Sequence, residues 1–519
     1  MADYLVGCDV GTGGTKAVVI ATDGTVLGSH FVEYPLITAK DPEDRFRGAK
    51  AEQDPEWYWQ AVTETVSVSI RQARIDPKDI KGVGVSGLSP ICIPVNKELR
   101  PLSNAHIWLD RRATEECDWL RREIGEDRIF RITGNVIDPF YGTPKVMWIK
   151  NHRPGIYAAA HCFLTSPGYI VMRLTGKTTI DHSNASLYGM AYNLIERQWD
   201  QQLVEEVGLD PEKLPHSFAC DEVVGEVTRE ASTQTGLPAG TPVVAGTVDA
   251  NASWLAAGAV DPGAAHIMLG TSGVLGVVHR SNKFTRGLIV NVHAANPRCL
   301  YTTAGATANC GSLLRYLRDQ FGECERAQEG ATGRSAYDQL CQEASQAPPG
   351  SDGLVVLPYF MGERTPMWDP NARGVVFGLT LHHTRGHWVR AFLEATAYAL
   401  RQNYEIMSSS GLPMNLPIIL GEGGARSPLW RQIMADVLNV ECAYSPCSKG
   451  APFADAVIAG IGVGIYRNYD VIKKAVQTGE VSVPDPVSHS RYMDYYNVFR
   501  GLYPALKAQF VKLAEARQQ

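Results

Sequence analysis

The alternation of apolar and polar positions predicts three consecutive short strands in the first 45 residues. The clearest pair is GCDVGTGGTKAVVI (residues 7–20), where a glycine-threonine turn separates two runs rich in β-branched residues. Asp23-Gly24 is a hairpin signal before the third strand. A helix is predicted from Asp54-Pro55 onward, because aspartate caps helices and proline fits their first turn. This part of the chain is therefore predicted to be a mixed α/β layer.

The strand pattern begins again just before the middle of the chain. TPVVAGTVDANAS (241–253) opens with a strand, and HIMLGTSGVLGVVHR (266–280) is again strand, glycine-threonine turn, strand. One such turn is explained by hairpin geometry alone, but two in matched positions predict duplicated domains. Backbone N–H groups and hydroxyls in such turns can hold phosphate oxygens. We therefore interpret the turns at 11–14 and 270–273 as facing one nucleotide triphosphate.

Composition narrows the class of protein. A chain of 519 residues exceeds one usual core, so two domains are expected. A net charge of −6 with interspersed signs gives no reason to expect a nucleic-acid partner. Eleven cysteines without C-x-x-C spacing indicate reduced core thiols. The glycine-rich apolar run 456–466 is too short for a bilayer and predicts a buried helix, so no membrane partner is expected. Residues 1–20 show no secretory signal, which favours a cytoplasmic protein.

Two aspartates occupy positions where chemistry is expected. Asp249 follows a strand and has small neighbours, which leave room for a substrate hydroxyl and fit a general base in phosphoryl transfer. The alternative is that Asp249 only caps a helix. Asp9 ends the first strand, and its carboxylate suits Mg²⁺. The alternative for Asp9 is an Asx turn. The turn itself does not match the dinucleotide fingerprint, because Lys16 stands where the third glycine belongs. It does not match the Walker loop either, because Lys16 is followed by Ala17.

Two further stretches fit ligand binding. In PIILGEGGARSPLWRQIMADVLN a strand leads through a glycine loop into a helix that Ser427 caps and Pro428 begins. Such a loop lets a backbone approach a nucleoside, and it is also an ordinary strand-to-helix turn. In IWLDRRA (107–113), Trp108 beside Asp110 is a combination that binds sugars. The alternative there is a buried tryptophan next to a solvated charge run.

Taken together, these segments resemble the FGGY family of carbohydrate kinases, within the actin-like ATPase superfamily. The C-terminal half resembles the xylulokinase branch, chiefly through GERTPMWDPNARG and GGARSPLWRQIMADVL. The matching segments follow the family's order from about residue 5 to residue 465. They are GCDVGTGGTKAVVI, IWLDRRA, YGTPKVMWIKN, GTVDANAS, MLGTSG, PYFMGERTPMWDPNARGVVFGL and GEGGARSPLWRQIMADVL.

The resemblance implies an α/β fold of two actin-like (ribonuclease H-like) ATPase domains around a central cleft, with a sugar-binding domain at 1–250 and a nucleotide-binding domain at 251–519. It implies ATP and Mg²⁺ as cofactors and a sugar as the substrate. Asp249 is then the catalytic base, and Asp9 and Asp249 are placed at the metal. The remaining assignments are Thr12, Gly13, Gly270, Thr271, Ser272, Gly423, Gly424, Ala425 and Ser427 for the nucleotide, and Ser89, Trp108, Asp110, Phe140 and Asp249 for the sugar.

The departures from the family pattern fall on the sugar side. Gly87-Leu88-Ser89-Pro90 stands where xylulokinases share Gln-Met-His and glycerol kinases share Arg-Glu, and Leu109 replaces the usual asparagine after Trp108. A ketopentose such as xylulose is the expected acceptor. Ribulose, hexuloses, tetruloses and glycerol-like polyols stay open, as does a sugar-sensing pseudokinase. Similar proteins are often homodimers, but the sequence identifies no interface.

Overall fold

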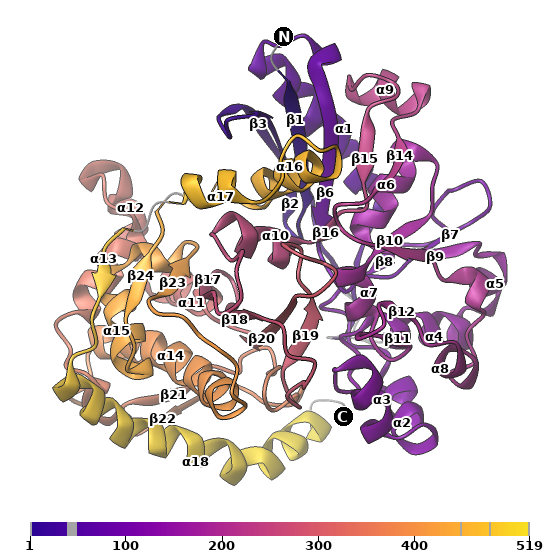
Figure 1. Cartoon of the computed structure of the whole chain (residues 1–519). Coiled ribbons are helices and arrows are strands. Elements are labelled where there is room, and N and C mark those ends of the chain that lie inside the picture. Colours follow the sequence, from indigo (N-terminus) through magenta and orange to yellow (C-terminus); the bar gives the residue numbers. More distant parts are fainter. Residues whose placement is uncertain (1–2, 39–48, 447–448, 477–478, 517–519) are drawn as a thin grey trace.

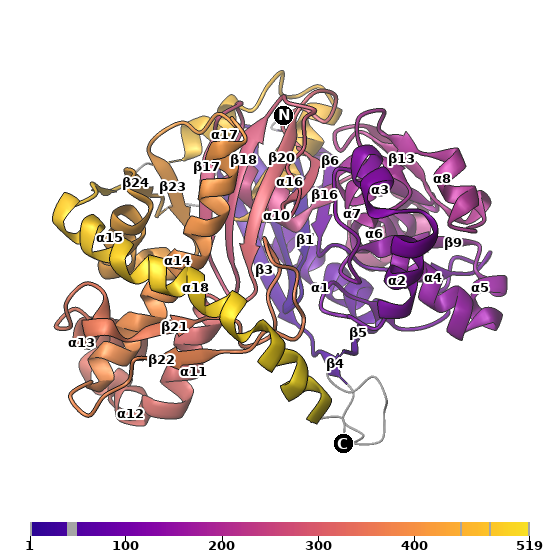
Figure 2. The same cartoon turned by 90° about the horizontal axis from the view of Figure 1, so that it is seen from below.

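The protein is described by a computed structural model over residues 3–38, 49–446, 449–476 and 479–516. Two seven-stranded sheets form the centres of two halves that lie side by side (Figures 1 and 2). The first sheet has the order β14-β15-β6-β1-β2-β3, with β16 beside β6. Its strands are β1 (Tyr4–Val10), β2 (Gly14–Ala21), β3 (Val26–Glu33), β6 (Ile80–Gly87), β14 (Val223–Glu226), β15 (Pro242–Val244) and β16 (Thr247–Val248).

The second sheet repeats the topology of the first. Its order is β19-β20-β18-β17-β23-β24-β25. In each sheet a first strand pairs antiparallel with the next (β1 with β2, β17 with β18) and parallel with a later one (β6 and β23). This repeat confirms the duplication predicted from the two turns. The strands are β17 (Ala265–Leu269), β18 (Gly273–His279), β19 (Ile289–Val292), β20 (Tyr301–Thr307), β23 (Ile418–Gly421), β24 (Cys442–Tyr444) and β25 (Val481–Ser482).

Helices cover both sheets, and short strands connect them. The helices not discussed individually below are α2 (Thr114–Glu123), α3 (Glu126–Thr133), α4 (Gly142–His152), α5 (Pro154–Ala159), α6 (Ser166–Thr175), α7 (His182–Tyr188), α8 (Gln201–Glu206), α9 (Arg229–Thr235), α12 (Glu323–Thr332), α17 (Asp470–Ala475) and α18 (Pro486–Ala516). The short strands are β4 (Ile37–Thr38), β5 (Ala51–Gln53), β7 (Ile93–Val95), β8 (Ala105–His106), β9 (Cys162–Leu164), β10 (Thr179–Asp181), β11 (Tyr192–Asn193), β12 (Gln198–Trp199), β13 (His216–Phe218), β21 (Val355–Leu357) and β22 (Val375–Phe377).

The start of α1 (Pro55–Ala73) is set locally, as predicted. The Asp54 side chain accepts a hydrogen bond from the backbone N–H of Glu56 at 2.9 Å, and Pro55 occupies the first helical position. An aspartate at this place satisfies an N–H group that has no partner within the helix.

Helix α16 (Ala451–Gly462) is the predicted buried helix, and it packs against β1 and β6 of the first sheet. Figure 1 shows this gold helix beside the indigo strands. The approach is close enough to require glycine, because a Cβ on Gly84 would lie 2.0 Å from the Asp455 carbonyl oxygen. A segment of the predicted second domain thus covers the first sheet. The boundary between residues 250 and 251 stays a prediction.

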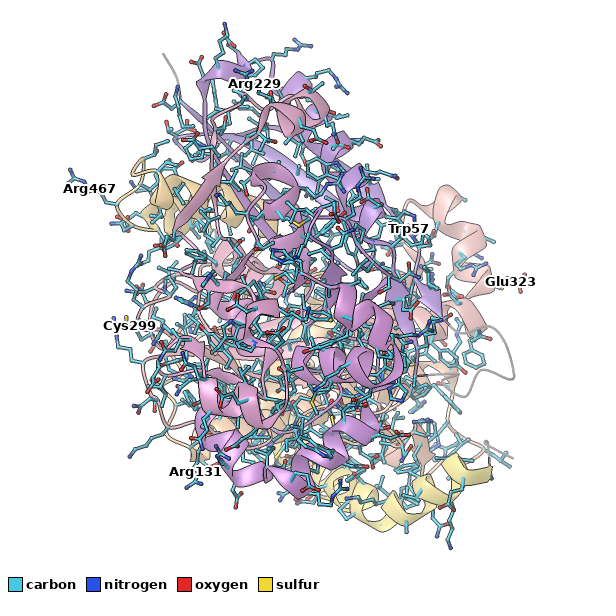
Figure 3. The ribbon with its side chains drawn as sticks, turned by 90° about the vertical axis from the view of Figure 1, so that its right-hand side faces the viewer. Trp57, Arg131, Arg229, Cys299, Glu323 and Arg467 are labelled. Carbon is cyan, nitrogen blue, oxygen red and sulfur yellow. The ribbon has the colours of Figure 1, made fainter. Side chains whose placement is uncertain are left out.

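The remaining composition-based expectations concern cysteines, membranes and surface charge. The ten cysteines within the described residues are free thiols, most of them buried, and Cys447 lies outside those residues. Across the described chain, no helix combines the length and the apolar character needed to span a bilayer. Figure 3 shows Arg131, Arg229, Glu323 and Arg467 pointing outward from separate parts of the surface. This spread agrees with the interspersed charges of the sequence.

Candidate active site

Asp249 is the first residue of α10 (Asp249–Ala256), directly after β16. The N-cap residue of this helix is Val248, so Asp249 does not occupy the position of a capping aspartate. One carboxylate oxygen, Oδ1, accepts a hydrogen bond from the adjacent Ala250 N–H at 2.7 Å. Burial, and then the negative charge of Asp9, raise the pKa of Asp249 to about 8.

Asp9 lies in β1, just before the first glycine-threonine turn. The Ser86 hydroxyl lies 3.0 Å from Asp9 Oδ1 and 2.7 Å from Oδ2 of Asp455 on α16. Among the described residues no backbone N–H donates to the Asp9 carboxylate, so the Asx-turn alternative is not observed. Burial, together with the charge of Glu422, raises the pKa of Asp9 to about 6.

Besides burial, the charges of these carboxylates act on one another and raise their pKa values, and a divalent cation would relieve this repulsion. The pKa of Asp455 is also held well above its usual range, by burial and then by the charge of Asp9. Within the described ranges no group of three or more His, Cys, Asp or Glu side chains could hold a metal by itself. A magnesium ion at Asp9 and Asp249 would therefore complete its shell with nucleotide phosphate and water oxygens, which is usual for this ion.

The two glycine-threonine turns join antiparallel strands as predicted. The first turn is closed by Gly11 N–H, which donates to the Gly14 carbonyl at 3.0 Å. The second is held by a distant segment, because Gly311 N–H donates to the Gly270 carbonyl at 2.7 Å. Gly13 and Thr271 are exposed, and Ser272 is half-buried. The Glu422 side chain lies near both turns. Its charge acts on Asp9, and its Cγ would be 3.8 Å from a Cβ placed on Gly270.

The loop after β23 leads into a helix that begins at the predicted residues, Ser427 and Pro428. The Ser427 hydroxyl accepts a hydrogen bond from Trp430 N–H at 3.4 Å and caps α15 (Pro428–Leu438). Gly424 is explained by packing, because a Cβ there would lie 2.9 Å from the Leu269 carbonyl oxygen, and Ala425 is buried. A Cβ on Gly423 would meet nothing within 4 Å. The space beside Gly423 is therefore open.

The residues predicted for the sugar fall into two groups. Trp108 Nε1 donates to the Thr12 hydroxyl at 2.9 Å, which ties it to the first turn. The buried Oγ of Ser89 has no hydrogen-bond partner among the described residues. Asp110 is buried and accepts from Ala51 N–H at 2.8 Å and from Arg112 Nε at 3.0 Å. Because these internal bonds occupy its carboxylate, Asp110 is better placed to support the site than to bind sugar.

The loop at 358–379, in the second half of the chain, contacts Trp108 and Phe140. The Arg364 guanidinium lies over the Trp108 ring, 5.3 Å from its centroid. Phe140 is buried and packs edge-to-face with Trp368, with centroids 6.1 Å apart. Sequence reasoning missed both partners. The available signal was the charged pair Glu363-Arg364 inside the glycine- and proline-rich loop at 358–379.

One cavity lies away from these residues. It measures about 310 Å³ and lies between α11 (Gly311–Phe321), α13 (Ala336–Ala344) and α14 (Arg385–Ser409). None of the predicted site residues lines it. Its lining is Leu317, Phe321, Leu340, His383, Arg385, Trp388 and Val389.

Comparison with known proteins establishes the family. The model of the N-terminal domain of the FGGY family of carbohydrate kinases matches residues 4–256, and that of the C-terminal domain matches residues 265–461. The crystal structure of xylulose kinase from Rhodospirillum rubrum is 31% identical in sequence and covers 98% of this chain and 99% of that one, with a TM-score of 0.85. The duplicated fold is therefore that of a two-domain carbohydrate kinase. The chain belongs to the FGGY family.

The similar proteins do not share one named substrate. The gluconokinase of Bacillus subtilis (strain 168) is 29% identical over 99% of this chain and 98% of its own length. The xylulose kinase of the same organism is 25% identical over 97% of both chains. The crystal structure of gluconate kinase from Lactobacillus acidophilus is 26% identical and covers 99% of this chain and all of its own, with a TM-score of 0.87. At these sequence identities the comparisons establish the family but do not decide between xylulose and gluconate as the substrate.

Proposed function

We propose that this protein transfers the γ-phosphate of ATP to a hydroxyl of a small sugar, with Asp249 as the general base. The proposal rests on the hydrogen bonding and the raised pKa of Asp249. Its second carboxylate oxygen has no hydrogen-bond partner among the described residues, and burial beside Asp9 raises its pKa to about 8. A base is most effective when its pKa lies near the working pH, which this value approaches.

The other predicted residues take complementary roles in this proposal. Asp9 holds Mg²⁺, and the turns at Thr12, Gly13, Gly270, Thr271 and Ser272 bind the phosphates. Gly423 admits the nucleoside. When bound, Mg-ATP supplies the phosphoryl group and a cation that neutralises charge. The chain itself orients the hydroxyl against Asp249 and keeps water from the reacting atoms.

The acceptor is proposed as a ketopentose such as xylulose, from the sequence resemblance and from the relatives named xylulose kinases. The relatives named gluconokinases support gluconate as the second candidate. A pseudokinase is disfavoured, because Asp9 and Asp249 are both present and close enough to affect each other's ionisation. The cytoplasmic location and the homodimer stay predictions.

The test is ADP release by the purified protein with Mg-ATP across ketopentoses, ketohexoses, tetruloses, polyols and gluconate. One acceptor should raise the rate far above the rate without acceptor, and chelating Mg²⁺ should abolish the increase. The Asp249→Asn variant serves as the blank. If no acceptor raises ADP release while one binds in calorimetry, the protein is a sugar sensor and the proposal fails.

A further inference from the structure

The half-buried Arg364 feels the charges of Glu363 and Asp138 but forms no direct ion pair with either. No carboxylate of the described residues lies within ion-pair distance of its guanidinium. Its Nε is buried without a hydrogen-bond partner, and Nη2 makes only a 3.4 Å contact with the Thr307 carbonyl. Burying a charge without a partner is unfavourable. Burial lowers the pKa of Arg364 to about 10 although the charge of Glu363 opposes this shift, and the guanidinium stays charged at neutral pH.

The neighbouring acidic side chains are already occupied. Asp138 is paired with Arg111 through oxygen–nitrogen contacts of 2.6 and 2.8 Å. Glu363 accepts from the N–H groups of Ala308 and Arg364 at 2.7 and 2.8 Å and from the Thr307 hydroxyl at 2.7 Å. These bonds fix the loop that carries Arg364 but leave the guanidinium charge unpaired. An anion that is not part of the folded chain would complete the site.

The position of Arg364 indicates which anion this is. On one side it stacks on Trp108, whose indole N–H is bonded to Thr12 in the first turn. On the other side it contacts Thr307, which pairs with Gly273 immediately after the second turn. Strands β18 and β20, which carry Gly273 and Thr307, run side by side near the centre of the molecule (Figure 1). Arg364 therefore lies between the structural supports of both phosphate-binding turns.

We propose that Arg364 is a catalytic residue that contacts the phosphoryl group as it passes from ATP to the acceptor. This inference rests on the proposed kinase function. In the step, the bond from the γ-phosphorus to the bridging oxygen of ADP breaks and a bond to the acceptor oxygen forms. The acceptor proton goes to Asp249, and ADP keeps the bridging oxygen. The guanidinium neutralises charge on the oxygens of the transferred group, in the way that arginine acts in other phosphoryl transfers.

The experiment compares Arg364→Met, Arg364→Lys and a matched control, Arg229→Met, which removes an exposed arginine in α9 (Figure 3). Arg364→Met should lower kcat by about 100- to 1,000-fold, the loss seen when one donor to a developing charge is removed. The KM values for Mg-ATP and acceptor should change little. Arg364→Lys should retain part of the activity, because it keeps the charge but not the planar fork. Arg229→Met should behave as wild type. Melting curves check that each variant is folded.

A binding measurement separates this inference from the kinase proposal. Calorimetry gives the affinity for Mg-ADP with and without aluminium fluoride, which mimics the phosphoryl group in transfer. The fluoride should tighten binding to the wild type and to Arg229→Met but not to Arg364→Met, while affinity for Mg-ADP alone stays equal. That result supports Arg364 even if no acceptor is phosphorylated, in which case only the kinase proposal fails.

Three results would overturn the inference. The first is fluoride that has no effect on the wild type, or has the same effect on Arg364→Met. The second is an Arg364→Met variant in which the KM for acceptor is raised and kcat is unchanged, because that result would assign Arg364 to sugar binding. The third is wild-type kcat in Arg364→Met.

Discussion

Replacing Asp249 with asparagine removes a proton acceptor and alters little else. The Ala250 N–H donates to Oδ1 at 2.7 Å, and an asparagine in the same orientation keeps that bond with its own oxygen. The amide nitrogen takes the place of the second carboxylate oxygen, and it cannot accept a proton. Asp249 makes no capping bond to α10, so the helix loses no cap. The variant is therefore expected to fold and to bind acceptor with nearly unchanged affinity. Its affinity for Mg-ATP shows how much Asp249 contributes beside Asp9 at the metal.

The expected loss is in turnover. General-base catalysis contributes about 100- to 10,000-fold, which corresponds to about 2.7 to 5.4 kcal/mol in the activation barrier. The pH dependence gives a second measure, because only the ionised carboxylate can act as the base. With a pKa of about 8, Asp249 gains activity as the pH rises toward that value and levels off above it. A bound Mg²⁺ moves this limb to lower pH, since a cation favours the ionised form.

The assay is ADP release at saturating acceptor and Mg-ATP between about pH 6 and pH 9, with calorimetry for both ligands. Wild-type kcat should show the acidic limb, and Asp249→Asn should show a low rate that is flat with pH. A loss of activity of less than about threefold would refute the assignment of the base, because the smallest expected loss is about 100-fold. The same acidic limb in both proteins would refute the assignment of the pKa.

Three further predictions follow from single contacts. Thr271→Val should raise the KM for ATP more than the KM for the acceptor in steady-state kinetics, and the reverse order would place the second turn away from the phosphates. Asp455 is buried with a raised pKa, so above the pKa of an unfolded aspartate the folded protein keeps a proton that the unfolded chain releases. Stability is then lost as pH rises, and Asp455→Asn should raise the melting temperature more at about pH 8 than at about pH 5; equal gains would contradict this. Ser427→Ala removes the cap of α15 and should lower the free energy of unfolding by about 1 kcal/mol in denaturant titrations, whereas an unchanged value would mean that the 3.4 Å bond contributes nothing.

Some features were predictable because they depend on neighbours in the chain. Asp54 and Ser427 cap the helices that follow them, and both glycine-threonine turns join antiparallel strands. The repeat of this turn in the two halves also predicted the duplicated sheets. Capping and hairpin formation use hydrogen bonds within a few residues, so sequence patterns are enough to identify them. The resemblance to the FGGY family rests instead on the order of several such segments along the chain.

Which side chains meet between the halves was decided only by the tertiary structure. The sequence placed Trp108 and Asp110 together as sugar-binding residues, yet the fold occupies Asp110 with Arg112 and Ala51 and brings Arg364 over Trp108. It also buries Asp455 of α16 beside Ser86 and Asp9. The contacts of Arg364 with Trp108 and of Asp455 with Ser86 join residues hundreds of positions apart. Periodicity records only whether a position is buried, whereas charge pairing and pKa depend on which distant groups share that buried space.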